Sequence, residues 1–158
     1  MPVRGRGRPK GFDVTGALES AMRVFWAQGY AAAPVDLLCR QMHMPRASLY
    51  HTYGDKERLF LAAVAHYVDT RIARIAALLE TGQDLTQDLT GFFNGVIALA
   101  TDDPATSGCL VACVLADAAG ANPRLQAELS LRFEAIEQRL TDRLRLAQSR
   151  GDLAPGTD

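Results

Sequence analysis

Side chains that can hydrogen-bond to nucleic acid are concentrated in one short segment, residues 45–56. Arg46 carries a guanidinium whose parallel N–H donors match the edge of a guanine base or the oxygens of a phosphate. Ser48 and His51 offer further donors and acceptors for base edges or backbone oxygens. Lys56 closes the segment with a positive charge suited to a phosphate. These residue types at this close spacing favour recognition of nucleic acid over catalysis.

Two short helices joined by a tight turn are expected to position these side chains. In the first helix, apolar residues recur at helical spacing and form one face: Val35, Leu38, Cys39 and Met42. Pro45 ends this pattern, because it lacks an N–H and disfavours the helical conformation at Met44. It also suits the first position of a second helix, which reaches about Tyr53. In that helix Leu49 points inward, and the open side is left to Arg46, Ala47, Ser48, Tyr50 and His51. This is a helix-turn-helix arrangement, whose second helix can enter the DNA major groove.

The same segment resembles the TetR family of transcriptional regulators. The matching run is residues 45–60, PRASLYHTYGDKERLF, and Gly29-Tyr30 ahead of the helix pair also fits. The resemblance is strong over roughly residues 7–67 and extends to the later helices only in general pattern. It implies an all-α protein, with a three-helix helix-turn-helix head followed by a helical body for ligand binding and dimerisation.

The resemblance also implies roles within and just after the second helix of the pair. Tyr50, Thr52 and Tyr53 would contact phosphates or brace that helix. Lys56 would pair with a phosphate beside the N-terminus of the following helix. The alternative for His51 is a solvent-facing residue without a role, and for Tyr53 a ring in the core.

Three positions depart from the usual pattern of the family. Ala33-Pro34 stands where a hydroxyl residue commonly caps the first helix of the pair, and Asp36 partly offsets that loss through the helix dipole. His43 occupies a turn position where glycine is common, and histidine tolerates a positive φ better than most residues. Ala47 replaces a frequent glycine, which slightly rigidifies the second helix. None of these changes removes the motif.

The N-terminal segment, residues 1–11, is a basic arm rich in glycine and proline, with the cations Arg4, Arg6, Arg8 and Lys10. Arginines on such an arm can enter the narrow minor groove or contact phosphates, although a solubilising tail is the alternative. Residues 1–58 carry nine Lys/Arg and five Asp/Glu, a net charge of +4, whereas residues 59–158 carry eight and thirteen, a net charge of −5. The positive field therefore accompanies the helix pair.

The other helices are expected to form a scaffold and a larger body. One helix runs from about Asp13 to Gln28, and a long helix of about 24 residues, roughly 36 Å, follows Asp55. Further helices begin at Asp84 and at Asn122-Pro123, where side-chain caps are available, and the last helix ends at Gly151. The expected divisions are an arm over residues 1–11, a DNA-binding domain over 12–55, and a regulatory and dimerisation domain over 56–158.

The expected function is that of a sequence-specific DNA-binding repressor. It would bind a palindromic operator as a homodimer and leave the operator when a small apolar or aromatic effector binds. Residues that could line the effector site are Tyr67, Phe92, Phe93, Val96, Leu110 and Cys113, although aromatic and apolar stripes are more often plain core. In the family that the chain resembles, two more helices commonly follow the position of Asp158 and build the dimer interface. Either the chain is shortened at its C-terminus, or the dimer forms mainly through the helix that begins at Asn122.

Other classes of protein fit the sequence less well. The three histidines are scattered, and no nucleophile, zinc-protease or P-loop motif is present, so no enzyme activity and no cofactor are expected. Cys109 and Cys113 are more consistent with small buried core residues than with a redox switch or half of a metal site. No apolar run could span a membrane, and three cysteines without regular spacing suit the cytoplasm. The alternative to a DNA-binding regulator is a helical protein-interaction adaptor. Binding by such an adaptor would not show the steep salt dependence of phosphate-driven binding.

Overall fold

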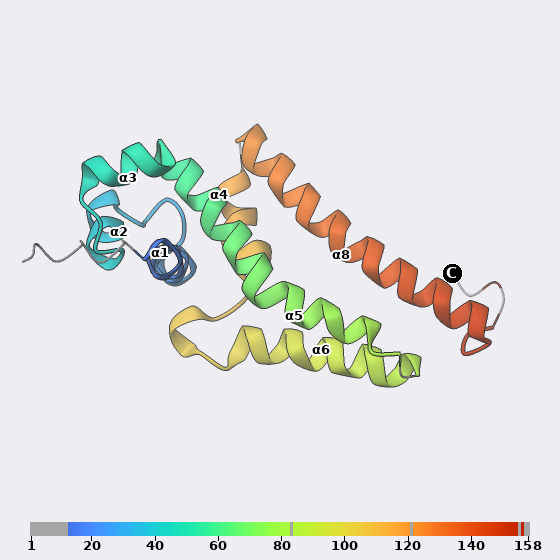
Figure 1. Cartoon of the computed structure of the whole chain (residues 1–158). Coiled ribbons are helices and arrows are strands. Elements are labelled where there is room, and N and C mark those ends of the chain that lie inside the picture. The colour runs from blue at the N-terminus through green and yellow to red at the C-terminus, as the bar shows by residue number, and fades with distance from the viewer. Residues whose placement is uncertain (1–12, 83, 121, 155, 157–158) are drawn as a thin grey trace, which may run out of the picture.

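The computed structural model describes residues 13–82, 84–120, 122–154 and 156, and across these residues the fold is all-α, as predicted. Figure 1 shows a head of three short helices at one end of a long helical path and a body at the other. The head contains α1 (Val14–Gln28), α2 (Val35–Gln41) and α3 (Arg46–Tyr53). The elements of the path and body are α4 (Lys56–Tyr67), η1 (Val68–Ile72), α5 (Ala73–Ala76), η2 (Ala77–Glu80), α6 (Leu85–Thr101), η3 (Pro104–Thr106), η4 (Leu110–Leu115), α7 (Ala116–Ala119) and α8 (Pro123–Arg150). The predicted arm, with Arg4, Arg6 and Arg8, lies outside the described residues.

Local capping sets the ends of the main helices as the sequence predicts. Asp13 accepts a hydrogen bond from the Gly16 N–H at 3.0 Å, and Asp55 accepts one from the Arg58 N–H at 2.7 Å. Asn122 caps α8, and Gly151 ends that helix in the left-handed conformation, with φ at 82°. Each cap satisfies backbone groups that a helix end leaves without an intrahelical partner.

The head is built around α1, which buries one apolar face against α4. The buried residues of α1 are Ala17, Ala21, Met22, Phe25 and Trp26. The Phe25 ring lies edge-on to the fully buried ring of Phe60 in α4, with centroids 5.0 Å apart. In the turn between α2 and α3, His43 has φ at 51°, so this residue adopts the left-handed conformation that glycine commonly provides. No side chain caps α2, whose N-cap is Pro34, and this agrees with the hydroxyl that the sequence lacks there.

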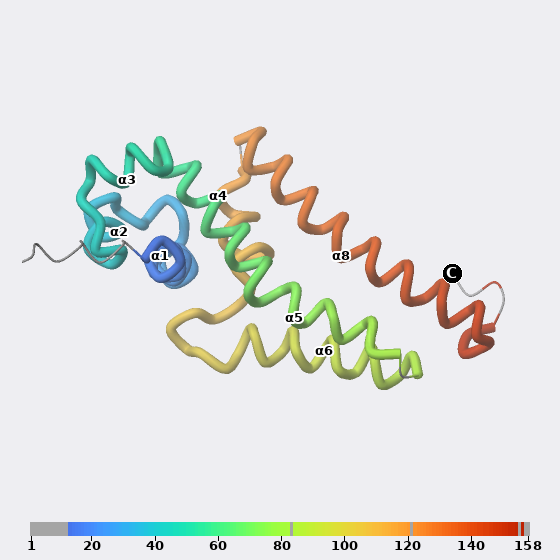
Figure 2. The backbone as a smooth tube through the Cα atoms, in the orientation of Figure 1, coloured from blue at the N-terminus to red at the C-terminus, as the bar shows by residue number. Residues whose placement is uncertain are grey.

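The long helix predicted after Asp55 is continuous in direction but not uniform in winding. Figure 2 shows one nearly straight path from α4 through α5, and residues 56–80 follow it. Residues Val68–Ile72 form a π-helical turn, and Ala77–Glu80 form a 3₁₀ turn at the far end. Apolar periodicity alone does not reveal such a turn, because the pattern is compatible with several windings.

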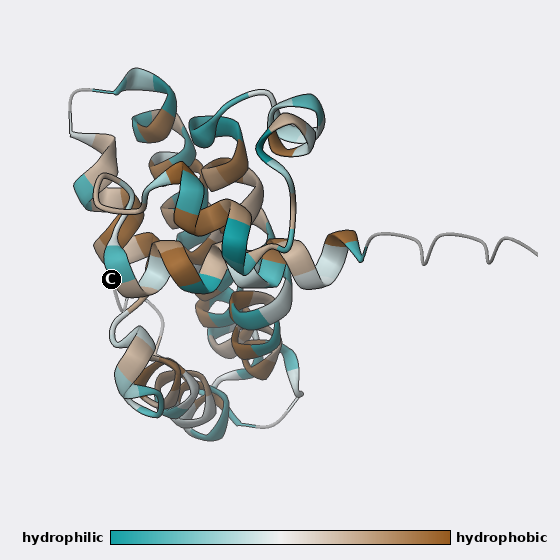
Figure 3. Cartoon of the chain, turned by 90° about the vertical axis from the view of Figure 1, so that its left-hand side faces the viewer, coloured by the Kyte–Doolittle hydropathy of each residue, from teal (hydrophilic) through white to brown (hydrophobic). Residues whose placement is uncertain are grey.

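The body packs α6 and α8 about the far part of this path (Figure 1). Figure 3 shows hydrophobic segments facing the interior of the helical assembly and hydrophilic segments on the outside. Several large apolar side chains of the body are nevertheless exposed: Phe93, Val96 and Ile97 of α6, and Leu131, Phe133, Leu144 and Leu146 of α8. Within the described ranges, no helix is both long enough and apolar enough to cross a membrane.

Candidate nucleic-acid interface

The recognition helix α3 presents a polar face to solvent, because only Leu49 of its eight residues is buried. Its exposed residues include the five predicted for the open side, Arg46, Ala47, Ser48, Tyr50 and His51, together with Thr52. A shallow hollow runs along this face, lined by Ala47, Ser48, His51 and Thr52 with Met44 and Pro45. The buried Leu49 packs α3 against the rest of the head, and the hydrogen-bonding side chains of α3 therefore lie on its solvent-exposed side.

Arg46 contacts two neighbouring side chains of the head. Its guanidinium donates to Asp36 Oδ1 at 3.0 Å and to the Tyr50 hydroxyl at 3.5 Å, and its Cζ lies 5.8 Å from the centre of the Tyr50 ring. The hydrogen bond to Tyr50 and the negative charge of Asp36 raise the pKa of Arg46 above its ordinary value. A guanidinium oriented in this way retains further N–H donors for a base edge or a phosphate.

Lys56 lies at the first position of α4, close to the recognition helix. Its Nζ donates to the Ala31 carbonyl at 3.4 Å and lies 4.9 Å from the centre of the Tyr30 ring. Partial burial lowers the pKa of Lys56. The helix N-terminus and the ammonium group are thus on the same side of the head, where both attract an anion.

Tyr53 differs from the other predicted contact residues, because it packs against the hydrophobic core. Its hydroxyl is buried and has no hydrogen-bond partner among the described residues. Burial raises the pKa of this phenol. These contacts match the bracing role that the sequence offered for Tyr53, and a phosphate could reach its hydroxyl only after a local rearrangement.

The interaction of Asp36 with the exposed face of α3 was not predicted from the sequence. Its carboxylate contacts Arg46, ten residues later, across the turn. The sequence assigned Asp36 only to the dipole of α2, because a pair at this separation follows from the crossing of two helices and not from helical periodicity. Opposite charges on either side of a predicted turn are the one signal that could have suggested the pair.

Comparison with known proteins decides the family. A family model described as bacterial regulatory proteins, tetR family, matches residues 17–63, and one described as Tetracyclin repressor-like, C-terminal domain, matches residues 86–158. The uncharacterized HTH-type transcriptional regulator YezE of Bacillus subtilis is 32% identical over 137 residues, which cover 86% of this chain and 68% of that protein. The chain belongs to the TetR family.

Two further proteins resemble the chain over nearly its whole length. The HTH-type transcriptional repressor ComR of Escherichia coli is 28% identical over 160 residues, covering 98% of this chain and 74% of that protein. A solved structure of a cysteine mutant of the TetR family regulator CifR, complexed with 26-bp double-strand operator DNA, superposes with a TM-score of 0.86 at 30% identity. The superposition covers 96% of this chain and 79% of the CifR chain. The chain is thus a sequence-specific DNA-binding transcriptional regulator, with a helix-turn-helix head and a helical body.

The body of this TetR family member contains a cavity of about 270 Å³ between η1, α5, η4 and α8. Its walls are mainly apolar: Val68, Ile72, Ala73, Ala76, Val111, Ala112, Phe133, Ala135 and Ile136. Asp69, Cys109, Arg132 and Arg139 also line it. Glu128 pairs with Arg132 at 2.6 Å and Glu80 pairs with Arg139 at 2.7 Å, so both guanidinium groups already have anionic partners.

The six residues predicted for an effector site are not brought together in this cavity. Tyr67 and Leu110 are fully buried, and the Tyr67 hydroxyl donates to Cys109 Sγ at 3.4 Å. Phe92 is buried on α6, whereas its neighbours Phe93 and Val96 are exposed. Cys109 is partly buried and packs against the core, whereas Cys113 is exposed, so the prediction of two small buried core cysteines is wrong for Cys113. The reason is that Leu110, Val111 and Leu115 fill the core side of η4 and leave Cys113 on its outer side.

Proposed function

We propose that this protein is a homodimeric repressor that binds a palindromic operator through α3 and releases it when a small apolar or aromatic effector binds the body. The observation that carries the proposal is the exposed polar face of α3, on which Asp36 and Tyr50 already orient Arg46. The similarity to ComR, a transcriptional repressor, supports the direction of regulation. The CifR complex with operator DNA supports a double-stranded target. Such a regulator acts in the cytoplasm and has no catalytic task.

The proposed DNA contacts follow from the side chains of the head. Arg46, Ser48 and His51 read base edges, and Ala47 allows close approach to the groove. Tyr50, Thr52 and Lys56 contact phosphates, and Tyr53 braces the helix. The arm, with Arg4, Arg6 and Arg8, contacts the neighbouring minor groove or backbone. In this division residues 1–11 are the arm, 12–55 the DNA-binding domain, and 56–158 the regulatory and dimerisation domain.

The cavity between η1, η4 and α8 is the proposed effector site. Its apolar walls favour an apolar or aromatic compound, and the Glu128 and Glu80 carboxylates already neutralise the two arginines beside it. An effector lowers operator affinity only if it binds the DNA-bound and released conformations with different affinity.

Selection from randomised duplex DNA, with sequencing of the bound fraction and measurement of the mass of the protein in solution, tests this proposal. The expected result is an enriched palindrome whose half-sites lie about one helical turn apart, roughly 34–36 Å, and a dimeric mass. No enrichment from a dimeric protein would overturn the repressor assignment. If the protein does not bind duplex DNA even at low salt, where phosphate-driven binding is strongest, the result would favour a protein-interaction adaptor.

Arg46→Ala is expected to weaken binding to the selected operator by about 1–3 kcal/mol and to weaken binding to random DNA less, because a base contact is lost. Affinity on both DNAs, measured by fluorescence anisotropy at one salt concentration, checks this. Arg46→Lys is the control, since it keeps the charge but loses the planar fork. Equal losses on both DNAs would make Arg46 a backbone contact.

Lys56→Ala is expected to weaken binding to all DNA sequences about equally and to reduce the slope of log affinity against log salt by about one unit. The reason is that loss of one phosphate contact releases one counterion fewer. Titrations over a range of salt concentrations measure the slope. Arg74→Ala, which removes an exposed charge on α5, should leave it unchanged. An unchanged slope for Lys56→Ala would remove Lys56 from the interface.

A further inference from the structure

Two π-helical segments help to line the cavity in the body. Val68, Asp69 and Ile72 of η1 belong to its lining, and so do Val111 and Ala112 of η4. π-Helical turns are rare and occur frequently at functional sites, and their i→i+5 hydrogen bonds enclose one residue more than those of an α-helix. Relaxing such a turn to α-helix would displace the side chains beyond it by about one residue, or about 1.5 Å along the axis.

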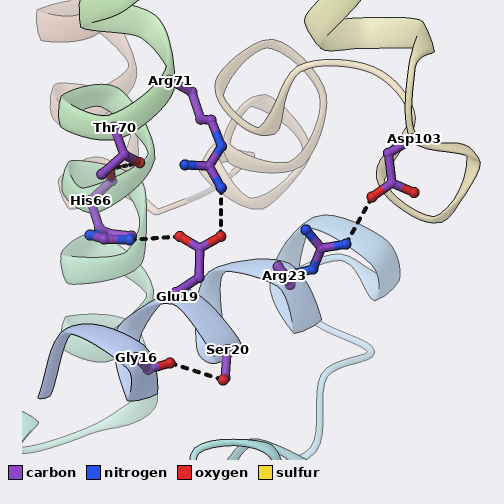
Figure 4. Close-up of polar contacts among 8 residues, drawn as sticks. All are labelled: Gly16, Glu19, Ser20, Arg23, His66, Thr70, Arg71 and Asp103. Atoms are coloured by element: carbon purple, nitrogen blue, oxygen red, sulfur yellow. Dashed lines mark hydrogen bonds and ion pairs between the residues drawn. The ribbon is translucent and has the colours of Figure 1, made fainter. Parts of the chain in front are cut away.

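The η1 segment also contacts α1 of the DNA-binding head. Arg71 of η1 pairs with Glu19 Oε1 of α1 at 2.5 Å, and His66 Nε2 of α4 contacts Glu19 Oε2 at 2.8 Å (Figure 4). Both carboxylate oxygens of Glu19 are therefore engaged by one face of the α4–η1 segment. The Thr70 hydroxyl bonds to the His66 carbonyl at 2.6 Å, which ties the π turn to the last turn of α4. The His66 side chain is only 11% exposed, so this cluster is partly shielded from solvent.

The loop that leads into η4 contacts the same helix of the head. The Trp26 indole N–H of α1 donates to the carbonyl of Gly108 at 3.0 Å, just ahead of Cys109 and η4. Arg23 of α1 pairs with Asp103 at 2.8 Å in the loop that leads there (Figure 4). α1 is thus bonded both to the α4–η1 segment and to the loop ahead of η4, and it packs directly on α2 and α4. When these two segments change their separation, α1 cannot keep both sets of bonds, so it moves with one segment and loses bonds to the other.

We infer that Glu19 is a positioning residue, which fixes the head on the body and, through Arg71, couples the occupancy of the cavity to the orientation of the recognition helix. This inference rests on the proposed function for its effect on the operator. Material in the cavity displaces η1, and Arg71 then moves relative to Glu19. Because α1 supports the helix-turn-helix, the two recognition helices of a dimer change their separation. By linkage, operator DNA would favour the empty cavity to the same extent.

A double-mutant cycle tests this coupling without a known effector. Ala135→Phe fills the cavity from α8, and Glu19→Gln removes the charge that Arg71 holds while keeping the size of the side chain. Each single variant is expected to weaken binding to the selected operator, by at least about fivefold. The double variant should bind no more weakly than Glu19→Gln alone, because the path is already broken. Asp142→Asn, which removes an exposed ion pair within α8, is the control and should leave affinity unchanged.

Multiplication of the two single effects in the double variant would overturn the coupling, as would an Ala135→Phe variant that folds and binds normally. Ala135→Leu provides a smaller filler if the phenylalanine variant does not fold. Amide hydrogen exchange gives a second readout that needs no DNA. Filling the cavity should accelerate exchange in residues 68–72 and in α1, and in the Glu19→Gln background it should accelerate exchange in residues 68–72 alone. If the wild-type protein selects no operator, the proposed function fails while this exchange pattern still decides the coupling.

Discussion

Replacement of Asp88 by alanine is expected to lower the free energy of unfolding by about 3–5 kcal/mol. Asp88 of α6 and Arg143 of α8 form a buried ion pair, with Arg143 Nε 2.7 Å from Asp88 Oδ2 and side chains that are 1% and 3% exposed. The Thr81 hydroxyl donates to the other carboxylate oxygen. Removing the carboxylate takes away the charge that offsets the desolvation of the buried Arg143 guanidinium, and loss of one partner of a buried ion pair is strongly destabilising. Urea unfolding followed by circular dichroism measures the change.

Two further variants separate the pair from the loss of one side chain. Replacing both partners, with Asp88→Leu and Arg143→Met, should recover most of the stability, because no charge is then buried. Asp142→Ala removes an exposed i,i+3 partner of Arg145 in the same helix and should cost less than about 1 kcal/mol. A loss below that value for Asp88→Ala would show that the pair is solvated in the folded protein.

The pair also predicts how stability depends on pH. Burial by itself would raise the pKa of Asp88, but the hydrogen bonds from Thr81 and Arg143 outweigh it and hold the pKa below its ordinary value. Because the pKa is lower in the folded state than the value of about 3.9 in the unfolded chain, this stabilisation is full above pH about 4. It is lost as the pH falls through the folded value. Stability of the wild type should therefore fall more steeply below pH 4 than that of the Asp88→Leu, Arg143→Met double variant.

Phe60→Ala is expected to lower the free energy of unfolding by about 3–5 kcal/mol and to reduce operator binding with it. The Phe60 ring of α4 is fully buried, 5.0 Å from the Phe25 ring and 4.8 Å from the Tyr30 ring. The substitution leaves a cavity between α1 and α4, where the head joins the rest of the chain. Tyr30 also lies against the Lys56 ammonium, so its displacement would disturb a proposed phosphate contact.

Thermal unfolding and operator titration of the same samples check this prediction. Phe93→Ala is the control, because 53% of the Phe93 surface is exposed and its substitution should lower stability less than that of the fully buried Phe60. Loss of operator affinity by the Phe60 variant at a temperature where it is fully folded would show that the ring shapes the interface as well as the core. An unchanged midpoint of unfolding would contradict the packing argument.

The sequence by itself determined the local structure of this protein and its family. Asp13, Asp55 and Asn122 act as helix caps where the sequence placed them, and Pro45 opens the recognition helix. The exposed face of α3 was also predictable, because a helix with a single inward leucine leaves its other side chains in water. Each of these features depends on groups within a few residues of one another, whose geometry a helix sets by its own periodicity.

Tertiary structure alone decided the contacts between helices. Arg143 of α8 is buried against Asp88 of α6, which lies 55 residues away in the sequence. Glu19 meets Arg71 from 52 residues away, and Asp36 meets Arg46 across the turn. The predicted effector residues shared apolar character but not a cavity, and the π turns at its walls left no mark in the apolar pattern. A helical stripe shows which side of a helix is buried, whereas the residue it meets depends on the crossing angle and register of two helices, which only the packed chain sets.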